Sequence, residues 1–481
     1  MAAEHGVVPA ADLESGAMAM PPLGLITEPA PAPLEQSEVR LEPTLGAERI
    51  SSVDVLRGIA LLGIALMNII FSGLPLAADF NPKVAGGASG PNLAAYFLQY
   101  ALFDGKMRGL FSMMFGASAY YLITRGAKRG AGLLVAEIYY RRILWLMVFG
   151  IVHAYLIWAG DILYPYALLG LILFPLLRLS PKVLLIMAGI LIAAMTGFQI
   201  QGGFEAQSMH RLMLEANAAI AAHKKPTDEQ KKAKQQWEER TKYFAPSAED
   251  LKNETDQYRG SYFHLVAKRA GLVKQWHSQP FYMSGWDMLT MMLVGIAFAK
   301  SGVLAAEKSY RFYLRLMSIS FAIGLPVSVL MVWLTWKQNF EPLQAVFTFS
   351  TYQIGRVAMT LGYASLFLLA CKAGVFRGLQ ARLATIGQTA FSNYILHSLI
   401  YGFVFYGYGL SLFNRLQRYQ LYCIVLGMWI VSLIVSPIWL AHFRFGPLEW
   451  CWRSLTYWRR QPMRVKEESA VAAPSPYAAS A

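Results

Sequence analysis

The chain is short of charged residues and of cysteine. Only 15% of its 481 residues are charged, whereas soluble proteins carry about a quarter. The three cysteines, Cys371, Cys423 and Cys451, have no pairing pattern and no metal-ligand spacing. These shortages argue against a soluble domain, a disulfide scaffold and a cysteine metal site, and we expect no bound metal.

Recognisable catalytic motifs are also missing. No P-loop, GxGxxG, HExxH, GxSxG or CxxC signature lies in a suitable context. The sequence therefore gives no motif for nucleotide hydrolysis, dinucleotide binding, zinc proteolysis or serine hydrolysis.

Apolar segments dominate what is present. The chain is 56% hydrophobic with a mean hydropathy of +0.37, and long apolar runs alternate with basic clusters. This pattern is typical of an all-α, polytopic membrane protein. In such a protein the net charge of +14 marks loops and contacts with anionic lipid, so we expect membrane lipids as partners and no nucleic acid.

The apolar runs predict ten membrane spans. They cover roughly residues 53–74, 103–124, 142–160, 162–178, 182–200, 284–302, 312–335, 346–371, 385–407 and 419–441. A separate short helix over 92–102 is expected at the interface. Residues 50–460 form the predicted membrane domain, and residues 1–49 and 461–481 are expected to be disordered cytoplasmic tails.

Lys and Arg counts in the short loops predict the orientation. The loops after the second, fourth, sixth and eighth spans and the C-terminal segment are rich in Lys and Arg, and the opposite loops are poor in them. Both termini are therefore predicted to be cytoplasmic, in a bacterial inner membrane. No apolar segment with a cleavage site precedes residue 50, so we expect the first span to direct insertion.

The one long loop, residues 201–281, is predicted to be an extracytoplasmic insertion of two or three amphipathic helices. Pro226 breaks its first helix, and capping boxes are expected at 227–230 and 247–250. Two roles are open for this insertion: a solvated spacer, or a cap over a substrate opening.

The first span carries Asp54, Arg57 and Asn68 within an apolar run. Residues 57 and 68 face the same side of a helix, because eleven residues turn through nearly three full turns. Asp54 and Arg57, three residues apart, are expected to pair. The stripe should face protein rather than lipid; an interfacial anchor is the alternative for Arg57.

The third span contains His153, which is followed by Asp161 in a turn expected at the outer surface. An ionisable residue inside a membrane is a functional candidate, and histidine titrates near neutral pH as a general base must. The alternative for His153 is a structural hydrogen bond between helices.

The eighth and ninth spans add Arg356, Asn393 and His397. Arg356 keeps its charge near mid-membrane and needs an anionic partner. Asn68, His153, Arg356 and His397 fall at a similar depth. They predict either one shared buried site or a structural hydrogen-bond network.

Several segments together resemble the YeiB-like family of bacterial membrane proteins, catalogued as a domain of unknown function. The matching segments are "RISSVDVLRGIALLGIALMNI" (49–69), "LFDGKMRGLFSMMFGA" (102–117), "RRILWLMVFGIVHAYLIWAGDILYPYALLGL" (141–171), "RGSYFHLVAKRAG" (259–271), "GQTAFSNYILHSLI" (387–400) and "FRFGPLEWCWRSLTY" (443–457). The resemblance spans about 49–460.

The first of these segments also looks like the opening helix of transmembrane acyltransferases. The sugar O-acyltransferase branch has a histidine where this chain has Asn68, and asparagine cannot act as a general base. The heparan-alpha-glucosaminide N-acetyltransferase branch takes its histidine from the loop after the first helix, but residues 72–102 contain none. If the resemblance implies acyl transfer, His153 is the best-placed base.

Three functions follow from these patterns. In the first, His153 and Asp161 activate a hydroxyl or amine acceptor, Asn68 and Arg356 stabilise the thioester carbonyl, and acyl-CoA is the donor substrate. Asp54, Arg57, Asn393 and His397 would then line the binding site. The second is a transporter of a small anion that binds Arg356, and the third is a non-catalytic envelope protein; a homo-oligomer is compatible with each.

Overall fold

The computed structural model describes residues 49–242, 244–278 and 285–465. They belong to one compact unit, Leu41–Ala481; the other unit, Met1–Arg40, lies outside the described residues. The predicted N-terminal tail falls almost wholly outside them. Residues 461–465 of the predicted C-terminal tail are described, and Arg464 pairs with Phe443 in an antiparallel bridge.

Within the described ranges the chain is helical and forms no strand. The α-helices are α1 Ser51–Gly73, α2 Ala77–Phe80, α3 Gly90–Leu98, α4 Lys106–Lys128, α5 Leu134–Val152, α6 Leu163–Leu176, α7 Pro181–Ala221, α8 Asp228–Thr241, α9 Ala248–Tyr258, α10 Tyr262–Ser278, α11 Trp286–Lys300, α12 Tyr310–Lys337, α13 Pro342–Thr348, α14 Tyr352–Ala373, α15 Arg377–Gln388, α16 Ala390–Phe405, α17 Arg418–His442 and α18 Pro447–Thr456. Two π-helical segments, η2 (Gln99–Phe103) and η3 (His153–Ile157), and a 3₁₀ turn, η5 (Phe349–Thr351), extend α3, α5 and α13.

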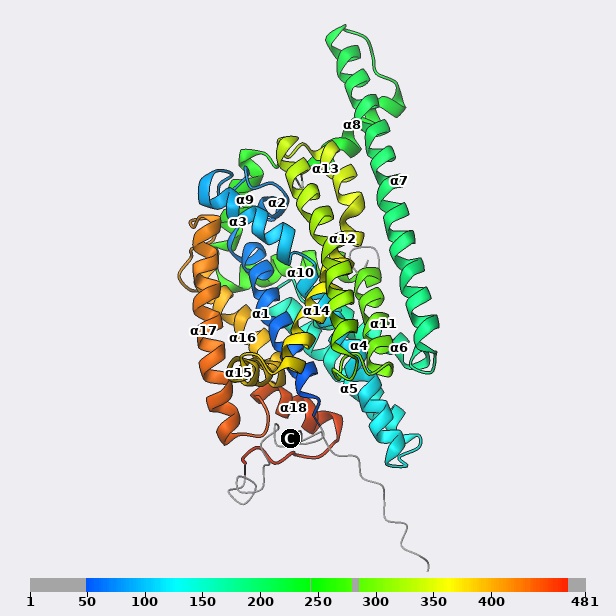
Figure 1. The fold of residues 1–481 in the computed structure, drawn as a ribbon. Helices are drawn as coiled ribbons and strands as arrows, with labels where there is room; N and C mark the ends of the chain where they lie inside the picture. The colour runs from blue at the N-terminus through cyan, green and yellow to red at the C-terminus, as the bar shows by residue number, and fades with distance from the viewer. Residues whose placement is uncertain (1–48, 243, 279–284, 466–481) are drawn as a thin grey trace, which may run out of the picture. The chain divides into compact units, whose positions relative to one another are not determined.

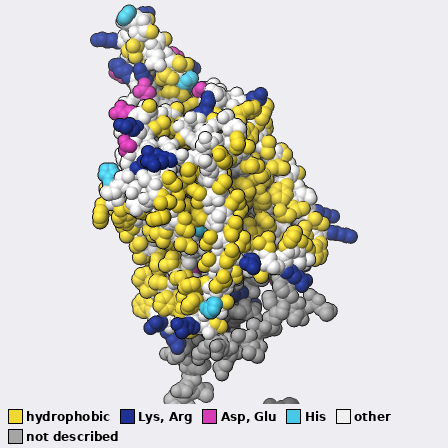
Figure 2. Space-filling view, turned by 90° about the vertical axis from the view of Figure 1, so that its left-hand side faces the viewer, with side chains coloured by type: hydrophobic (Ala, Val, Ile, Leu, Met, Phe, Trp, Pro, Cys, Tyr) yellow, Lys and Arg dark blue, Asp and Glu magenta, His cyan; other side chains and the backbone are white. Residues whose placement is uncertain are grey.

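The helices identify a helical membrane protein. A helix occupies each predicted span, and five stretches are long and apolar enough to cross a bilayer: Ser51–Gly73, Pro181–Ala221, Tyr310–Lys337, Pro342–Ala373 and Arg418–His442. Figure 2 shows hydrophobic side chains covering the middle of one face, with charged side chains toward its two ends. The count of ten spans stays a prediction.

α1 is the central element of the fold. It packs against α4, α15, α16 and α17 (Figure 1), and most of its residues are buried. A side chain on Gly58 or Gly387 would collide with backbone of the opposite helix, because α1 and α15 touch there. This contact holds Asp54 and Arg57 in the protein interior.

The ninth predicted span, 385–407, is not one continuous helix. The chain breaks at Thr389 between α15 and α16. The break leaves the carbonyl of Gly387 free to accept a hydrogen bond from Arg57 at 3.3 Å.

The insertion differs from the expectation at its start. α7 continues without a break from the predicted fifth span to Ala221, so residues 201–221 extend a membrane helix. Thr227 and Ser247 cap α8 and α9 through capping boxes, as predicted. α8 packs on α7, α9 binds the loop after α1 through Glu254, which accepts from the backbone N–H of Leu76, and α10 packs on η3. We call the end of the fold at which α1 finishes the insertion end, and the end at which α1 begins the basic end.

Candidate functional site

A cavity of about 210 Å³ opens among helix ends at the basic end. It is formed by the start of α1, the middle and end of α4, the middle of α5, the start of α6, the α15–α16 junction and α18. Five arginines line it: Arg49, Arg57, Arg125, Arg142 and Arg453. We call it the arginine cavity; its remaining wall is mainly aromatic and aliphatic, with Phe111, Phe115, Leu146, Tyr166, Phe391 and Tyr394.

Asp54 organises one side of this cavity. Its two carboxylate oxygens bind Arg57 Nη1 at 2.8 Å and Arg49 Nε at 2.9 Å. Arg57 also donates to Ser118 Oγ at 2.9 Å. The predicted Asp54–Arg57 pair is confirmed. Through Ser118 and the Gly387 carbonyl, Arg57 also connects α1 to α4 and α15.

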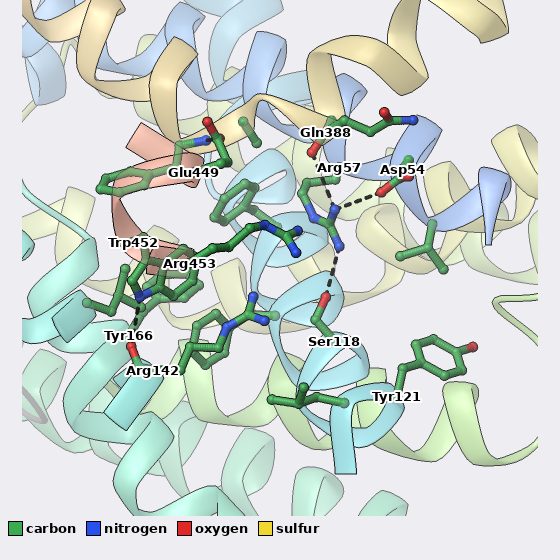
Figure 3. Close-up of a pocket in the computed structure, with 18 of the residues that line it drawn as sticks. Asp54, Arg57, Ser118, Tyr121, Arg142, Tyr166, Gln388, Glu449, Trp452 and Arg453 are labelled. Carbon is green, nitrogen blue, oxygen red and sulfur yellow. Dashed lines mark hydrogen bonds and ion pairs between the residues drawn. The ribbon is translucent and has the colours of Figure 1, made fainter. Parts of the chain in front are cut away.

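Arg142 and Arg453 form the opposite side. Arg142 lies 4.4 Å from the ring centre of Trp452, and Figure 3 shows the guanidinium groups of Arg57, Arg142 and Arg453 pointing toward a common space. Burial, and then the charges of Arg49 and Arg142, lower the pKa of Arg453, which lies on α18 outside the spans. The cavity therefore favours an anionic ligand.

Glu449, the other carboxylate on the cavity wall, has partners of its own. It accepts hydrogen bonds from the backbone N–H groups of Phe391 at 2.7 Å and Ser392 at 3.1 Å. It thus caps the start of α16, where the helix dipole favours a negative charge. Glu449 also interacts electrostatically with Arg57 and Arg453, but two carboxylates cannot balance the five arginines of the wall.

His153 and Asp161 form a buried pair behind the wall of this cavity, next to the wall residues Tyr394 and Ile162. His153 Nδ1 lies 2.8 Å from Asp161 Oδ1, and both side chains have no exposed surface. Asp161 Oδ2 accepts a hydrogen bond from the backbone N–H of Tyr164 at 2.7 Å. His153 Nε2 has no hydrogen-bond partner among the residues described. The expectation that Asp161 lies at the outer surface is wrong, because η3 and the turn after it fold the carboxylate back onto His153.

A second cavity lies at the insertion end. Its volume is about 480 Å³, and its walls come from the end of α1, the turn Trp158–Gly160, α9 and α10. We call it the insertion cavity. Among its charged residues, burial raises the pKa of Glu254 and lowers the pKa of Lys268 to about 8.

The His153 ring stands between the two cavities. Its centre lies 5.1 Å from that of Tyr394, on the wall of the arginine cavity, and 6.3 Å from that of Trp158, on the wall of the insertion cavity. Along the chain, Trp158–Gly160 line one cavity and Ile162 lines the other, with Asp161 between them. One buried imidazole is therefore adjacent to both walls.

The remaining predicted site residues lie in other networks. Arg356 is buried beside Gln353 and Asp287, and Asn68, half-buried on α1, makes no side-chain hydrogen bond to a described residue. Neither residue lines the arginine cavity or the insertion cavity. The structure thus brings His153 and Asp161 together, and Asp54 with Arg57, but it shows no contact that joins Asn68, His153 and Arg356.

Asn393 and His397 connect α16 to α17. Asn393 Nδ2 donates to Ser436 Oγ at 3.1 Å, and His397 Nε2 lies 3.4 Å from Ser432 Oγ. Polar links of this kind hold membrane helices together. The contact of His397 matches the structural alternative that the sequence leaves open for that residue.

Sequence reasoning missed Tyr394, Arg142 and Arg453. Tyr394 Oη accepts a hydrogen bond from the backbone N–H of Ile162 at 3.3 Å, and its ring packs against His153. Its position next to Asn393 in "SNYILH" is a weak signal. Arg142 and Arg453 belong to basic clusters that, in the sequence, indicate only orientation.

Relatives exist for nearly the whole chain. It is 30% identical over 438 residues to "Uncharacterized protein YxaH" of Bacillus subtilis (strain 168), covering 89% of this chain and 98% of the relative. It is 29% identical over 412 residues to "Uncharacterized protein YeiB" of Escherichia coli (strain K12), covering 85% and 96%. The model of the family described as "Protein of unknown function (DUF418)" matches residues 298–459.

The chain belongs to the YeiB-like DUF418 family. No solved structure matches it. Membership in the YeiB-like family names no reaction.

Proposed function

We propose that the protein is a membrane-embedded acyltransferase that moves an acyl group from cytoplasmic acyl-CoA to an extracytoplasmic hydroxyl or amine. The observation that carries this proposal is the buried His153–Asp161 pair between the arginine cavity and the insertion cavity. A base that serves two substrates from opposite sides of a membrane needs such a position.

The arginine cavity suits the donor. Coenzyme A carries phosphates, and guanidinium groups bind phosphate through paired hydrogen bonds. Arg57, Arg142 and Arg453 converge on one space (Figure 3), and the deeper wall is aromatic and aliphatic. The phosphates would bind at the basic end, and the thioester would extend toward Tyr394 and His153.

The insertion cavity suits the acceptor. It is the larger space, and its polar wall includes Asp250, Asn253, Glu254 and Gln257, which can hydrogen-bond hydroxyl or amine groups. Residues of α9 and α10 cover it, which favours the cap role of the insertion over the spacer role.

The pair is arranged for general base catalysis. With the Asp161 carboxylate accepting a hydrogen bond from Nδ1–H, Nε2 of His153 carries the free lone pair. Nε2 would take the proton of the acceptor as its oxygen or nitrogen attacks the thioester carbon. The C–S bond then breaks, and the same proton passes to the departing thiolate to give free CoA. The Tyr394 hydroxyl, whose oxygen accepts from Ile162, has its hydrogen available for the developing oxyanion.

The orientation follows the basic loops. Short loops rich in Lys and Arg favour the cytoplasm, so the basic end and both termini are assigned there and the insertion end to the outside. In this orientation the arginine cavity would open to the cytoplasm, where acyl-CoA is available.

Transport of a small anion is the second candidate function. The observation that favours it is the buried guanidinium of Arg356, whose two Nη atoms have no partner among the described residues. Transport predicts that acyl-CoA neither binds nor is consumed.

The test of acyl transfer is His153→Ala in the full-length protein reconstituted into vesicles. With acetyl-CoA as donor and a panel of small alcohols, amines and sugars as acceptors, products are measured by mass spectrometry. Transfer should fall by about 100-fold or more, because the general base is lost. Acetyl-CoA should still raise the unfolding temperature, since the arginines remain.

His397→Gln is the matched control. Its contact with Ser432 lies outside both cavities, so transfer should stay close to wild type. A His153→Ala protein that transfers acyl groups at the wild-type rate contradicts the proposal, as does a wild-type protein that does not bind acetyl-CoA.

A further inference from the structure

A second buried ionic cluster lies near the starts of three helices. Arg108 is in the first turn of α4, Asp287 in the first turn of α11, and Arg356 in the second turn of α14. Arg108 Nη2 lies 2.6 Å from Asp287 Oδ2, and Arg356 Nε lies 3.7 Å from the same oxygen. We call these three residues the Arg356 cluster.

The cluster contains polar atoms without partners. Arg356 is only 1% exposed, and its Nε donates to Gln353 Oε1 at 3.0 Å. Its Nη1 and Nη2 have no hydrogen-bond partner among the described residues, and neither do Asp287 Oδ1 and Arg108 Nε. Leaving a buried charged group unsatisfied is costly, so such a group calls for a ligand or solvent.

The charges of the cluster favour an anion. Two guanidinium groups share one carboxylate. Lys106 and Asp104, which interact electrostatically with this cluster, add one charge of each sign. An excess of one positive charge remains. The amino end of α4, which begins after Gly105, increases the positive potential, because helix dipoles are positive at that end.

The cluster lies at a close contact between helices but is open on one side. A Cβ at Gly109 would lie 2.7 Å from Thr360 Oγ1 and 3.2 Å from Arg356 Nη1, so the glycine allows α4 to pack closely against α14. The side chain of Arg108 is 24% exposed. The cluster is therefore not sealed.

We propose that the Arg356 cluster binds one oxyanion, a carboxylate or a phosphate, that carries a neighbouring hydroxyl or amine. Nη1 and Nη2 of Arg356 are two parallel donors that match two oxygens of such a group. Asp287 Oδ1, an acceptor without a partner, matches the neighbouring donor. This site does not depend on acyl transfer, because none of its three residues lines the arginine cavity or the insertion cavity.

The experiment measures the unfolding temperature of the full-length protein in detergent at constant ionic strength. The probes are lactate, acetate, inorganic phosphate and chloride, with phosphatidylglycerol as a lipid headgroup. We expect saturable stabilisation by an oxyanion and none by chloride. Lactate should bind more tightly than acetate, because only lactate has a hydroxyl for Asp287.

Three variants assign the effect to the cluster. Arg356→Gln should abolish the saturable stabilisation, and Arg356→Lys, which keeps the charge but not the fork, should weaken it by at least about tenfold. Arg382→Gln removes an exposed arginine whose Nη1 donates to the Leu433 carbonyl and should bind as wild type does. If Arg356→Gln does not fold, Arg356→Lys decides alone.

Each result has a meaning. Stabilisation by phosphatidylglycerol alone that Arg356→Lys weakens supports the site and identifies its oxyanion as a lipid phosphate. The proposal is overturned if no oxyanion stabilises the wild type, if chloride does so equally well, or if Arg356→Lys binds with wild-type affinity.

Discussion

Asp54 is the residue on which the charge balance of the arginine cavity depends. It is the carboxylate that binds both Arg49 and Arg57, and its side chain is only 6% exposed. A sequence can predict its partner three residues away, because that distance is fixed by the helix. It cannot predict the contacts of Arg57 with Ser118 and Gly387, which depend on how α4 and α15 pack.

Removing Asp54 should therefore be worse than removing the pair. Asp54→Leu leaves two cations without their carboxylate, and breaking a buried pair costs more than deleting it. We expect Asp54→Leu to lower the unfolding temperature in detergent more than the double variant Asp54→Leu, Arg57→Leu does. If the double variant is the less stable of the two, the carboxylate does not have this role.

The sequence also cannot predict the contact between His153 and Asp161. Both residues stand out in the sequence, since ionisable side chains are rare in apolar segments. Their pairing could not be predicted, because it depends on the π-helical segment η3 and on the turn that follows it. Asn68 also stands out, as a polar amide in an apolar segment, yet it lines neither cavity.

At the scale of elements, the sequence predicts features that depend on nearby residues, but it does not predict features that depend on helix packing. The capping boxes of α8 and α9 depend on residues three apart, so the sequence specifies them. The break at Thr389 has no glycine or proline at that position to mark it. It is stabilised by tertiary contacts, since Arg57 donates to the Gly387 carbonyl and Glu449 accepts from the backbone N–H groups of Phe391 and Ser392.

The close crossing of α1 and α15 gives a test with a control in the same helix. A Cβ at Gly387 would lie 1.9 Å from the carbonyl oxygen of Asp54, whereas Gly378 has no atom within 4 Å. Gly387→Ala should destabilise the protein by about 1–3 kcal/mol or more, because backbone cannot yield as a side chain can. Gly378→Ala should stay within about 1 kcal/mol of wild type.

The measurement is thermal unfolding followed by tryptophan fluorescence, with both variants prepared in parallel. Equal unfolding temperatures for Gly387→Ala and Gly378→Ala would mean that α1 and α15 are not in close contact in the membrane.

At the scale of the whole molecule, the two cavities lie toward opposite ends of the fold. The arginine cavity is lined by helix ends near the start of α1, and the insertion cavity by segments beyond its far end. On the face shown in Figure 2, hydrophobic side chains cover the surface between the charged ends. The basic loops in the sequence predict that the two ends differ. The sequence does not predict the cavities, because each cavity depends on the relative positions of several helices.

The orientation of the protein in the membrane can be measured by cysteine labelling. In a variant without Cys371, Cys423 and Cys451, we place single cysteines by Glu229→Cys and Gly378→Cys, both at exposed positions. An impermeant maleimide applied to whole cells should label position 229 and leave position 378 unlabelled until the cells are opened, because basic loops stay inside. Labelling of 378 alone in intact cells would reverse the assignment.

The central claim is that a donor enters at the arginines and reaches the base between the two cavities. The most direct test is a cryo-electron microscopy structure of the full-length protein with coenzyme A at saturating concentration. The account predicts CoA phosphates bound by Arg57, Arg142 and Arg453, with the thiol end directed toward Tyr394 and His153. Coenzyme A bound elsewhere, bound with its thiol directed away from His153, or not bound at all would contradict it.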